Sequence, residues 1–136
     1  MPLFAELASI AGAQELYDWF GYWPDFHDAE VLKLHLDRSG ASSLVVHTWE
    51  TTGRVNAQGF YDQARHVVVE FVLDAVSGLN LEDFNHQNVI ADLGVTKTET
   101  GFRLELGSSY GLSGTIEAQK IAVRITPGKP PQSLSS

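Results

Sequence analysis

The sequence of 136 residues contains no cysteine. Disulfide bonds, thiolate nucleophiles and zinc sites built on sulfur are therefore excluded. There is also no basic residue before Lys33, so the N-terminus lacks the positive region of a secretory signal and the arginines of a transit peptide. No uninterrupted apolar run approaches the roughly 20 residues that a membrane-spanning helix needs. Together these absences predict a cytoplasmic protein that does not insert into a membrane.

Basic residues are scarce throughout, with nine Lys and Arg against seventeen Asp and Glu, which gives a formal charge of −8. The first 32 residues carry no Lys or Arg and have these acids: Glu6, Glu15, Asp18, Asp25, Asp28 and Glu30. Because affinity for nucleic acids depends on basic side chains that neutralise phosphates, this charge argues against direct nucleic-acid binding. It permits a cationic partner.

The remaining composition is that of an ordinary globular protein, with 43% hydrophobic and 19% charged residues. A chain of this length has room for one hydrophobic core. We therefore predict a single α+β domain over residues 1–126. The Pro- and Ser-rich residues 127–136 cannot pair in a sheet, so they are predicted to form a tail.

One short helix is predicted near the N-terminus. Leu16, Tyr17 and Phe20 recur at helical spacing, and Gly21 follows where a left-handed cap would end the helix. From Glu30 onward, apolar residues instead alternate with polar ones, which is typical of half-buried strands.

The alternating runs cover residues 32–36, 44–51, 67–73, 89–95, 102–106 and 112–125. They predict a mainly antiparallel, strongly twisted sheet of six or seven strands with the helix packed on it. The polar residues 53–63 are predicted to form a loop. In the last run the apolar side chains change from even to odd positions near Gln119 and Lys120, which predicts a β-bulge.

A Gly-x-Ser-x-Gly pattern occurs at residues 107–111, as in serine hydrolases. In those enzymes the serine precedes a helix, and the catalytic histidine follows the serine in the chain. Here a strand is predicted after Gly111 and no histidine follows position 109. We therefore interpret the pattern as a turn between strands, with Ser108 and Ser109 inactive as nucleophiles.

Aromatic and acidic residues are concentrated between residues 19 and 30. Such side chains favour a partner-binding surface, since Trp and Tyr dominate interface hot spots and carboxylates supply complementarity. The residues assigned to this surface are Asp18, Trp19, Tyr22, Asp25 and Glu30. Trp23 and Phe26 are expected to anchor the helix to the sheet, while His27 and Asp28 are expected to make hydrogen bonds that fix the entry into the first strand.

An alternative interpretation is a small-ligand or metal-assisted enzyme with its site around Trp23, His27, Asp28 and Glu30, where carboxylate and imidazole groups would act as ligands or general base. The spacing of the other histidines does not indicate a metal site; they are His35, His47, His66 and His86. No cofactor or metal is therefore expected in the leading interpretation.

The string FGYWPDFHDAEV at residues 20–31, followed by an alternating strand, resembles the opening signature of the immunity protein 50 family of bacterial polymorphic toxin systems. FNHQNVI at residues 84–90 and YGLSG at residues 110–114 also resemble later segments of that family. The similarity extends to about Pro127. The resemblance implies a small α+β protein that protects its producer by binding a cognate toxin. In the leading interpretation the acidic N-terminal third covers a basic site on that toxin, such as the site of a nuclease. It assigns no catalytic residue.

Overall fold

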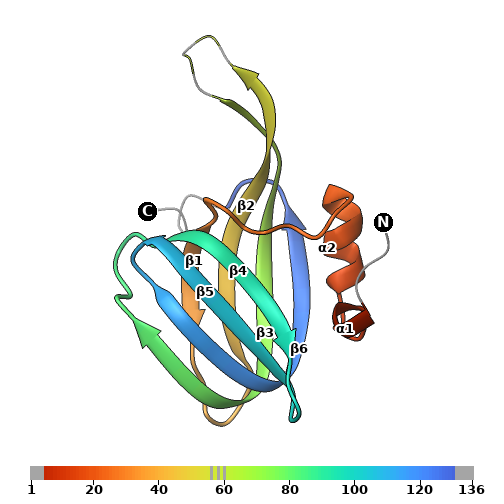
Figure 1. Ribbon diagram of the computed structural model, residues 1–136, viewed down its shortest axis with the longest axis vertical. Helices are drawn as coiled ribbons and strands as arrows, with labels where there is room; N and C mark the ends of the chain where they lie inside the picture. Colours follow the sequence, from red (N-terminus) through yellow and green to blue (C-terminus); the bar gives the residue numbers. More distant parts are fainter. Residues whose placement is uncertain (1–4, 56, 58, 60, 131–136) are drawn as a thin grey trace.

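The computed structural model describes residues 5–55, 57, 59 and 61–130, and this part of the chain forms two short helices and six strands (Figure 1). The helices are α1 (Ala5–Ala8) and α2 (Ala13–Phe20). The strands are β1 (Glu30–His35), β2 (Ser42–Val55), β3 (Tyr61–Glu82), β4 (Val89–Lys97), β5 (Phe102–Tyr110) and β6 (Ser113–Pro127). The α+β class, the antiparallel sheet and the short helix packed on it are confirmed.

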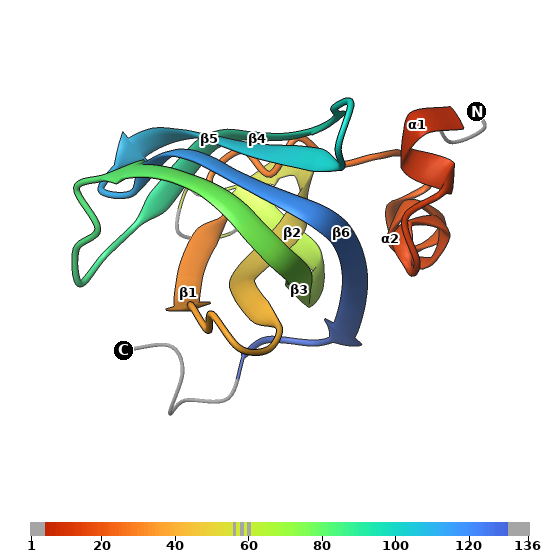
Figure 2. The same cartoon turned by 90° about the horizontal axis from the view of Figure 1, so that it is seen from below.

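The sheet closes on itself as a barrel in the order β1-β2-β3-β6-β5-β4, with every neighbouring pair antiparallel. In this order β1 and β6 are three places apart, so they lie on opposite sides of the barrel (Figure 2). The long strands β3 and β6 pair along most of their length and curve around the barrel together (Figure 1). Closure was not predicted from the sequence.

The seam between β1 and β4 closes the barrel with only one ladder pair, Glu30 with Val89. Backbone N–H groups extend the seam by donating to carbonyl oxygens as follows: Asp28 to Ile90 (2.8 Å), Ile90 to Ala29 (2.8 Å), Val31 to Asn88 (2.9 Å) and Leu93 to Asp25 (3.1 Å). Phe26 and Asp28 adopt positive φ angles of 62° and 67° within this stretch. The segment that precedes β1 is therefore tightly wound against β4.

Helix α2 packs on β6 through its apolar face. Gly12 precedes the helix with φ 85°, and Gly21 ends it with φ 83°, its N–H donating to the Tyr17 carbonyl at 2.7 Å. The predicted left-handed cap is therefore present. Ala11 also accepts a hydrogen bond from the Val123 N–H at 2.7 Å, which joins the start of α2 directly to β6.

The hydrophobic core fills the barrel and continues beneath α2. Phe26 reaches it from the segment before β1 and meets Phe71 edge-on, with ring centroids 5.7 Å apart. The largest fully buried side chains are Phe26, Phe71, Leu16, Leu44, Leu73, Ile90, Leu104, Leu112 and Ile116. Side chains from both helical and strand segments thus share one core.

Three local predictions differ from the structure. The predicted loop at residues 53–63 is largely strand, because β2 runs to Val55 and β3 begins at Tyr61 in a hairpin that projects beyond the barrel (Figure 1). Leu36 lies beyond β1 and is 48% exposed. The serines of the Gly-x-Ser-x-Gly pattern belong to β5, and the turn comes at Gly111 with φ 83°.

In β6 the side chains that point into the core change from even to odd positions, as predicted. Ala118 and Ile121 are both buried, so the inward positions change parity between them. The register shift itself lies in the partner strand β3, between Val76 and Gly78. At the other end β6 includes Pro127, one residue beyond the predicted domain end, and residues 131–136 of the predicted tail lie outside the described residues.

Candidate functional site

The segment between α2 and β1 crosses the end of the barrel from which the β2–β3 hairpin projects (Figure 1). It therefore connects the helix side of the barrel with the opposite side. The predicted partner-binding residues fall into three groups, which lie before, on and after this segment. Asp18 and Trp19 belong to α2 beside β6, whereas Glu30 belongs to β1 across the barrel. Tyr22 and Asp25 lie on the crossing segment.

Tyr22 and Asp25 gather with Glu50 of β2. Tyr22 is 46% exposed. Partial burial raises the pKa of the Tyr22 hydroxyl, and the charges of Glu50 and Asp25 raise it further, while nearby Arg65 opposes them. An exposed aromatic ring and carboxylates thus lie near one another at this end of the barrel, and Glu50 is a contributor that the sequence did not indicate.

Trp19 is mainly an anchor. Its indole Nε1–H donates to the Arg65 carbonyl oxygen at 3.1 Å, and the Arg65 guanidinium donates to the Trp19 carbonyl oxygen at 2.7 Å. Arg65 also pairs with Glu50 at 3.4 Å. Asp18 is exposed on the same helix and accepts a hydrogen bond from Gln14 at 2.8 Å.

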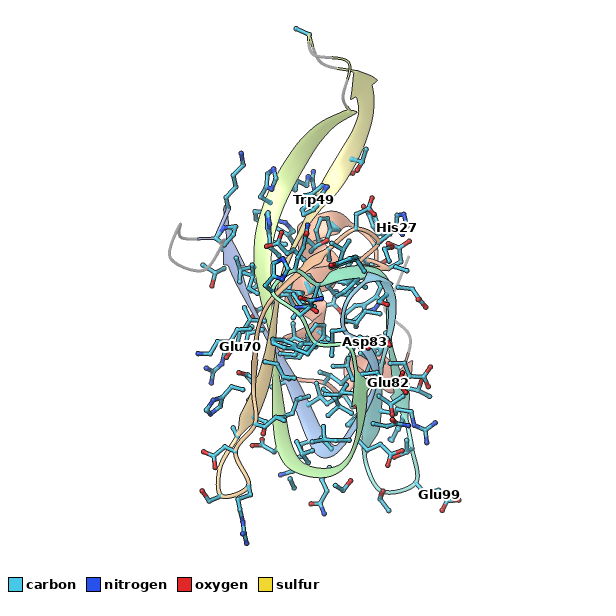
Figure 3. The ribbon with its side chains drawn as sticks, turned by 90° about the vertical axis from the view of Figure 1, so that its left-hand side faces the viewer. His27, Trp49, Glu70, Glu82, Asp83 and Glu99 are labelled. Atoms are coloured by element: carbon cyan, nitrogen blue, oxygen red, sulfur yellow. The ribbon has the colours of Figure 1, made fainter. Side chains whose placement is uncertain are left out.

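His27, labelled in Figure 3, forms an exposed pair with Asp28 at the seam. The His27 Nδ1 lies 2.9 Å from the Ala91 carbonyl oxygen, and because a carbonyl only accepts, Nδ1 carries the proton. The opposite nitrogen, Nε2, is 3.6 Å from an Asp28 carboxylate oxygen. The bond to Ala91 raises the pKa of His27, and the Asp28 charge adds to the effect.

The backbone of this pair also fixes the entry into β1. The His27 N–H donates to the Asp25 carboxylate at 2.9 Å, and the Asp28 N–H donates to Ile90. The structural role expected for the pair stays a prediction. The two side chains nevertheless remain 62% and 61% exposed, so both are available to a partner.

Three other residues of the segment 20–31 are buried or partly buried. Phe26 is 1% exposed, and Trp23 is partly buried against the core. Glu30 is partly buried on β1, where His47 is its ladder partner. Among the residues that the structure describes, no three His, Cys, Asp or Glu side chains come together as a metal-binding group.

A cluster that sequence reasoning missed lies at the base of the projecting hairpin. The His47 Nε2 and the His66 Nδ1 are 3.0 Å apart, and the two rings are nearly parallel, inclined by 23°, with centroids 5.2 Å apart. Trp49, labelled in Figure 3, lies 5.0 Å from the His47 ring and 6.0 Å from the His66 ring, centroid to centroid. Nothing in the chain separation of 19 residues indicated that these histidines meet.

The electrostatic state of the two imidazoles follows from their surroundings. Burial lowers the pKa of His47 to about 4, and the neighbouring His66 and Lys129 act in the same direction. Burial and Lys129 also lower the pKa of His66. Both rings are therefore neutral at pH 7.

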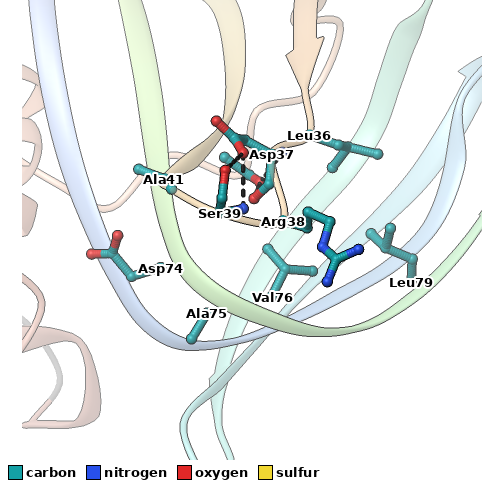
Figure 4. Close-up of a pocket in the computed structure, with 11 residues that line it drawn as sticks. Leu36, Asp37, Arg38, Ser39, Ala41, Asp74, Ala75, Val76 and Leu79 are labelled. Atoms are coloured by element: carbon teal, nitrogen blue, oxygen red, sulfur yellow. Dashed lines mark hydrogen bonds between the residues drawn. The ribbon is translucent and has the colours of Figure 1, made fainter.

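A pocket of about 710 Å³ lies between the β1–β2 turn and a bend in β3 (Figure 4). Leu36 and Leu79 line it and are each 48% exposed. The turn is held by Asp37, whose carboxylate accepts bonds from the Ser39 N–H and hydroxyl, both at 2.9 Å. Those two bonds lower the pKa of Asp37. None of the predicted site residues belongs to this pocket.

Comparison with known proteins gives one result. The model of a family described as Immunity protein 50 matches residues 12–128. No curated protein and no solved structure matches the chain. In the described part of the chain, no helix has the length and apolar character needed to cross a membrane.

Proposed function

Because the chain belongs to the immunity protein 50 family, we propose that it neutralises its toxin by binding through the barrel end that residues 21–29 cross. Membership of an immunity protein family itself implies a toxin-neutralising role and a cognate toxin as the partner. The location of the binding surface, the basic character of the toxin and a cytoplasmic site of action are our proposals.

The observation that carries the location is the cluster of Tyr22, Asp25 and Glu50. It combines a half-exposed aromatic ring with two carboxylates, whose charges both act on the Tyr22 hydroxyl. A ring of this kind is a typical interface anchor, and carboxylates accelerate association with a basic surface. The exposed pair His27 and Asp28 lies on the same crossing segment and extends this surface toward the seam.

The remaining predicted contacts extend the surface in two directions. Asp18 and Trp19 would meet the toxin only if it reaches over α2, and Glu30 only if it reaches over β1. The two groups lie on either side of Tyr22 and Asp25, because β1 and β6 are on opposite sides of the barrel and the crossing segment joins them. We therefore place the centre of the interface on Tyr22 and Asp25.

The test compares matched charge changes at the two ends of the barrel. The double variant Tyr22→Ala, Asp25→Lys should weaken binding of the cognate toxin by more than tenfold in calorimetry. Asp74→Lys carries the same charge change at the pocket end, and we expect less than a twofold effect. The single variants Asp18→Lys and Glu30→Lys then show on which side the interface continues.

Salt dependence provides a second measurement. Association of the wild type should slow as ionic strength rises, because attraction between opposite charges is screened over about 8 Å at physiological salt. The double variant should show a smaller salt effect. Equal affinity and equal salt dependence in wild type and double variant would place the toxin elsewhere on the barrel.

We also propose that the protein is not an enzyme. Ser108 and Ser109 are exposed on β5, and neither has a hydrogen bond to a histidine among the described residues. A fluorophosphonate probe should leave the folded protein unlabelled, and labelling of either serine would contradict the proposal. The enzyme alternative around Trp23, His27, Asp28 and Glu30 gains no specific support from the geometry.

A further inference from the structure

The outer wall of the barrel carries an uncommon pair of side chains where the hairpin leaves it. His47 of β2 and His66 of β3 face each other with ring nitrogens 3.0 Å apart. Neither histidine is among the residues assigned above to toxin binding. The proposal for toxin binding therefore does not explain why these two histidines meet.

An irregularity in the sheet creates this pair. Thr48 pairs with Val67 and Glu50 with Ala64, so two β3 residues, Arg65 and His66, stand opposite Trp49 alone. Such a β-bulge re-aims a side chain, and bulges are enriched beside functional sites. Arg65 also has φ 53°, an unfavourable angle for a residue with a side chain.

Contacts on both sides hold the bulge in place. Arg65 is fixed by its two hydrogen bonds to Trp19, and the His66 carbonyl oxygen accepts the Gly128 N–H at 2.7 Å. The ring of Trp49 packs against both imidazoles. The two nitrogens are thus presented by rigid elements, which is what a preorganised ligand site requires.

We propose that His47 and His66 bind one divalent transition-metal ion through Nε2 and Nδ1, respectively. Zinc binds imidazole nitrogen at about 2.0–2.1 Å, which places two ligands of a tetrahedral site about 3.3 Å apart. The observed 3.0 Å is within a few tenths of an ångström of that spacing. Imidazole ligands suit Zn²⁺, Ni²⁺ and Cu²⁺, and water would fill the remaining positions.

The protonation state of the pair is suitable for metal binding. Two neutral imidazoles each carry one N–H, and in the free protein one of these protons lies in the bond between the rings. On metal binding each ring keeps its proton on the nitrogen that faces away, so a tautomer shift suffices and no proton is lost.

Lys129 is the nearby charge that opposes the metal. Its positive charge acts on both histidines, and it would repel a divalent cation in the same way. Glu30, the ladder partner of His47, carries the opposite charge on the other side. The site is therefore expected to be of moderate affinity, and it should become tighter in Lys129→Gln.

The test measures binding of Zn²⁺ and Ni²⁺ to the full chain by calorimetry at pH 7. We expect one ion per chain in the wild type, at least tenfold weaker binding in His47→Gln and in His66→Gln, and tighter binding in Lys129→Gln. The matched controls are His35→Gln and His86→Gln, which remove exposed histidines elsewhere and should leave the affinity within twofold. Mg²⁺, which prefers oxygen ligands, should not bind at this site.

A second measurement does not depend on the histidine variants being folded. Cu²⁺ at the pair would lie beside Trp49 and quench its fluorescence, so Trp49→Phe should lose most of the Cu²⁺-dependent quenching that the wild type shows. Equal affinities in wild type, His47→Gln and His66→Gln, or quenching that persists in Trp49→Phe, would overturn the proposal. The histidines would then serve only to bond each other.

Discussion

Trp19 and Arg65 exchange two hydrogen bonds although they are 46 residues apart in the chain, the indole N–H donating at 3.1 Å and the guanidinium returning a bond at 2.7 Å. These bonds join the end of α2 to the base of the projecting hairpin. The crossing segment begins directly after this joint, and so Tyr22 comes to lie near Glu50. The proposed toxin surface thus depends on a contact between the helix and the bulged strand.

Trp19→Phe tests this joint. The substitution keeps an aromatic ring but removes the N–H that bonds to Arg65, so we expect the free energy of unfolding to fall by about 0.5–1.5 kcal/mol. Trp23→Phe is the matched control, because the Trp23 indole makes no hydrogen bond to any residue that the structure describes. Urea denaturation of both variants gives the comparison. A larger loss in Trp23→Phe would show that the Trp19 bond contributes little.

Phe26→Ala tests the role of the motif in the core. Phe26 is 1% exposed and meets Phe71 edge-on, so truncation should lower the free energy of unfolding by about 3–5 kcal/mol. Phe84→Ala removes the same side chain where it is 60% exposed, and about 0.5 kcal/mol or less is expected. Chemical denaturation measures both, and similar losses in the two variants would contradict the burial of Phe26.

Gly12→Ala tests how α2 is docked on β6. An added Cβ at Gly12 would collide with the backbone carbonyl of Val123, which cannot move without breaking the sheet. Gly21 has nearly the same φ, 83° against 85°, but an added Cβ meets nothing within 4 Å there. Gly21→Ala should therefore cost only the left-handed strain of about 1–2 kcal/mol.

Gly12→Ala should cost clearly more than that, since it adds the collision to the same strain. Thermal unfolding of the two variants separates these contributions. Equal melting temperatures would mean that the helix can move away from β6 without loss, and that Gly12 is needed only for its backbone angle.

The strands could be predicted because each has an alternating pattern with a clear buried face. Val67, Val69, Phe71 and Leu73 all point into the core, as the period of two indicated. The helix could be predicted for the same reason, since spacing and Gly21 both report on local structure. These features depend on residues that are close in the chain.

Closure of the barrel could not be predicted, because the seam is built by irregular backbone. Phe26 and Asp28 adopt left-handed angles that no alternation reveals, and the strand pair there consists of Glu30 and Val89 alone. The histidine pair was missed for a related reason. His66 reaches His47 only because the register of β3 shifts by one residue at Arg65, and a shift of this kind leaves no mark in an apolar pattern.

The charge state of His27 gives a pH-dependent prediction. The bond from Nδ1 to the Ala91 carbonyl raises its pKa above the ordinary 6.5, and the Asp28 carboxylate raises it further. A histidine whose folded pKa is raised stabilises the fold when protonated. This contribution is complete below the unfolded pKa near 6.5 and is lost as pH rises through the folded value.

Asp28→Asn isolates the part of the His27 pKa shift that is due to the Asp28 charge. Asparagine has the same shape and tolerates the left-handed φ of 67°, so the seam should remain folded while the pKa of His27 falls. Asp25→Asn should lower that pKa less, because Asp25 is the weakest of the influences that raise it. The measurement is a titration of the imidazole by nitrogen-15 NMR, which also reports the tautomer. We expect the neutral ring to carry its proton on Nδ1. A proton on Nε2 would show that the ring does not donate to Ala91. The exposed pair would then lack the bond that orients it toward a partner.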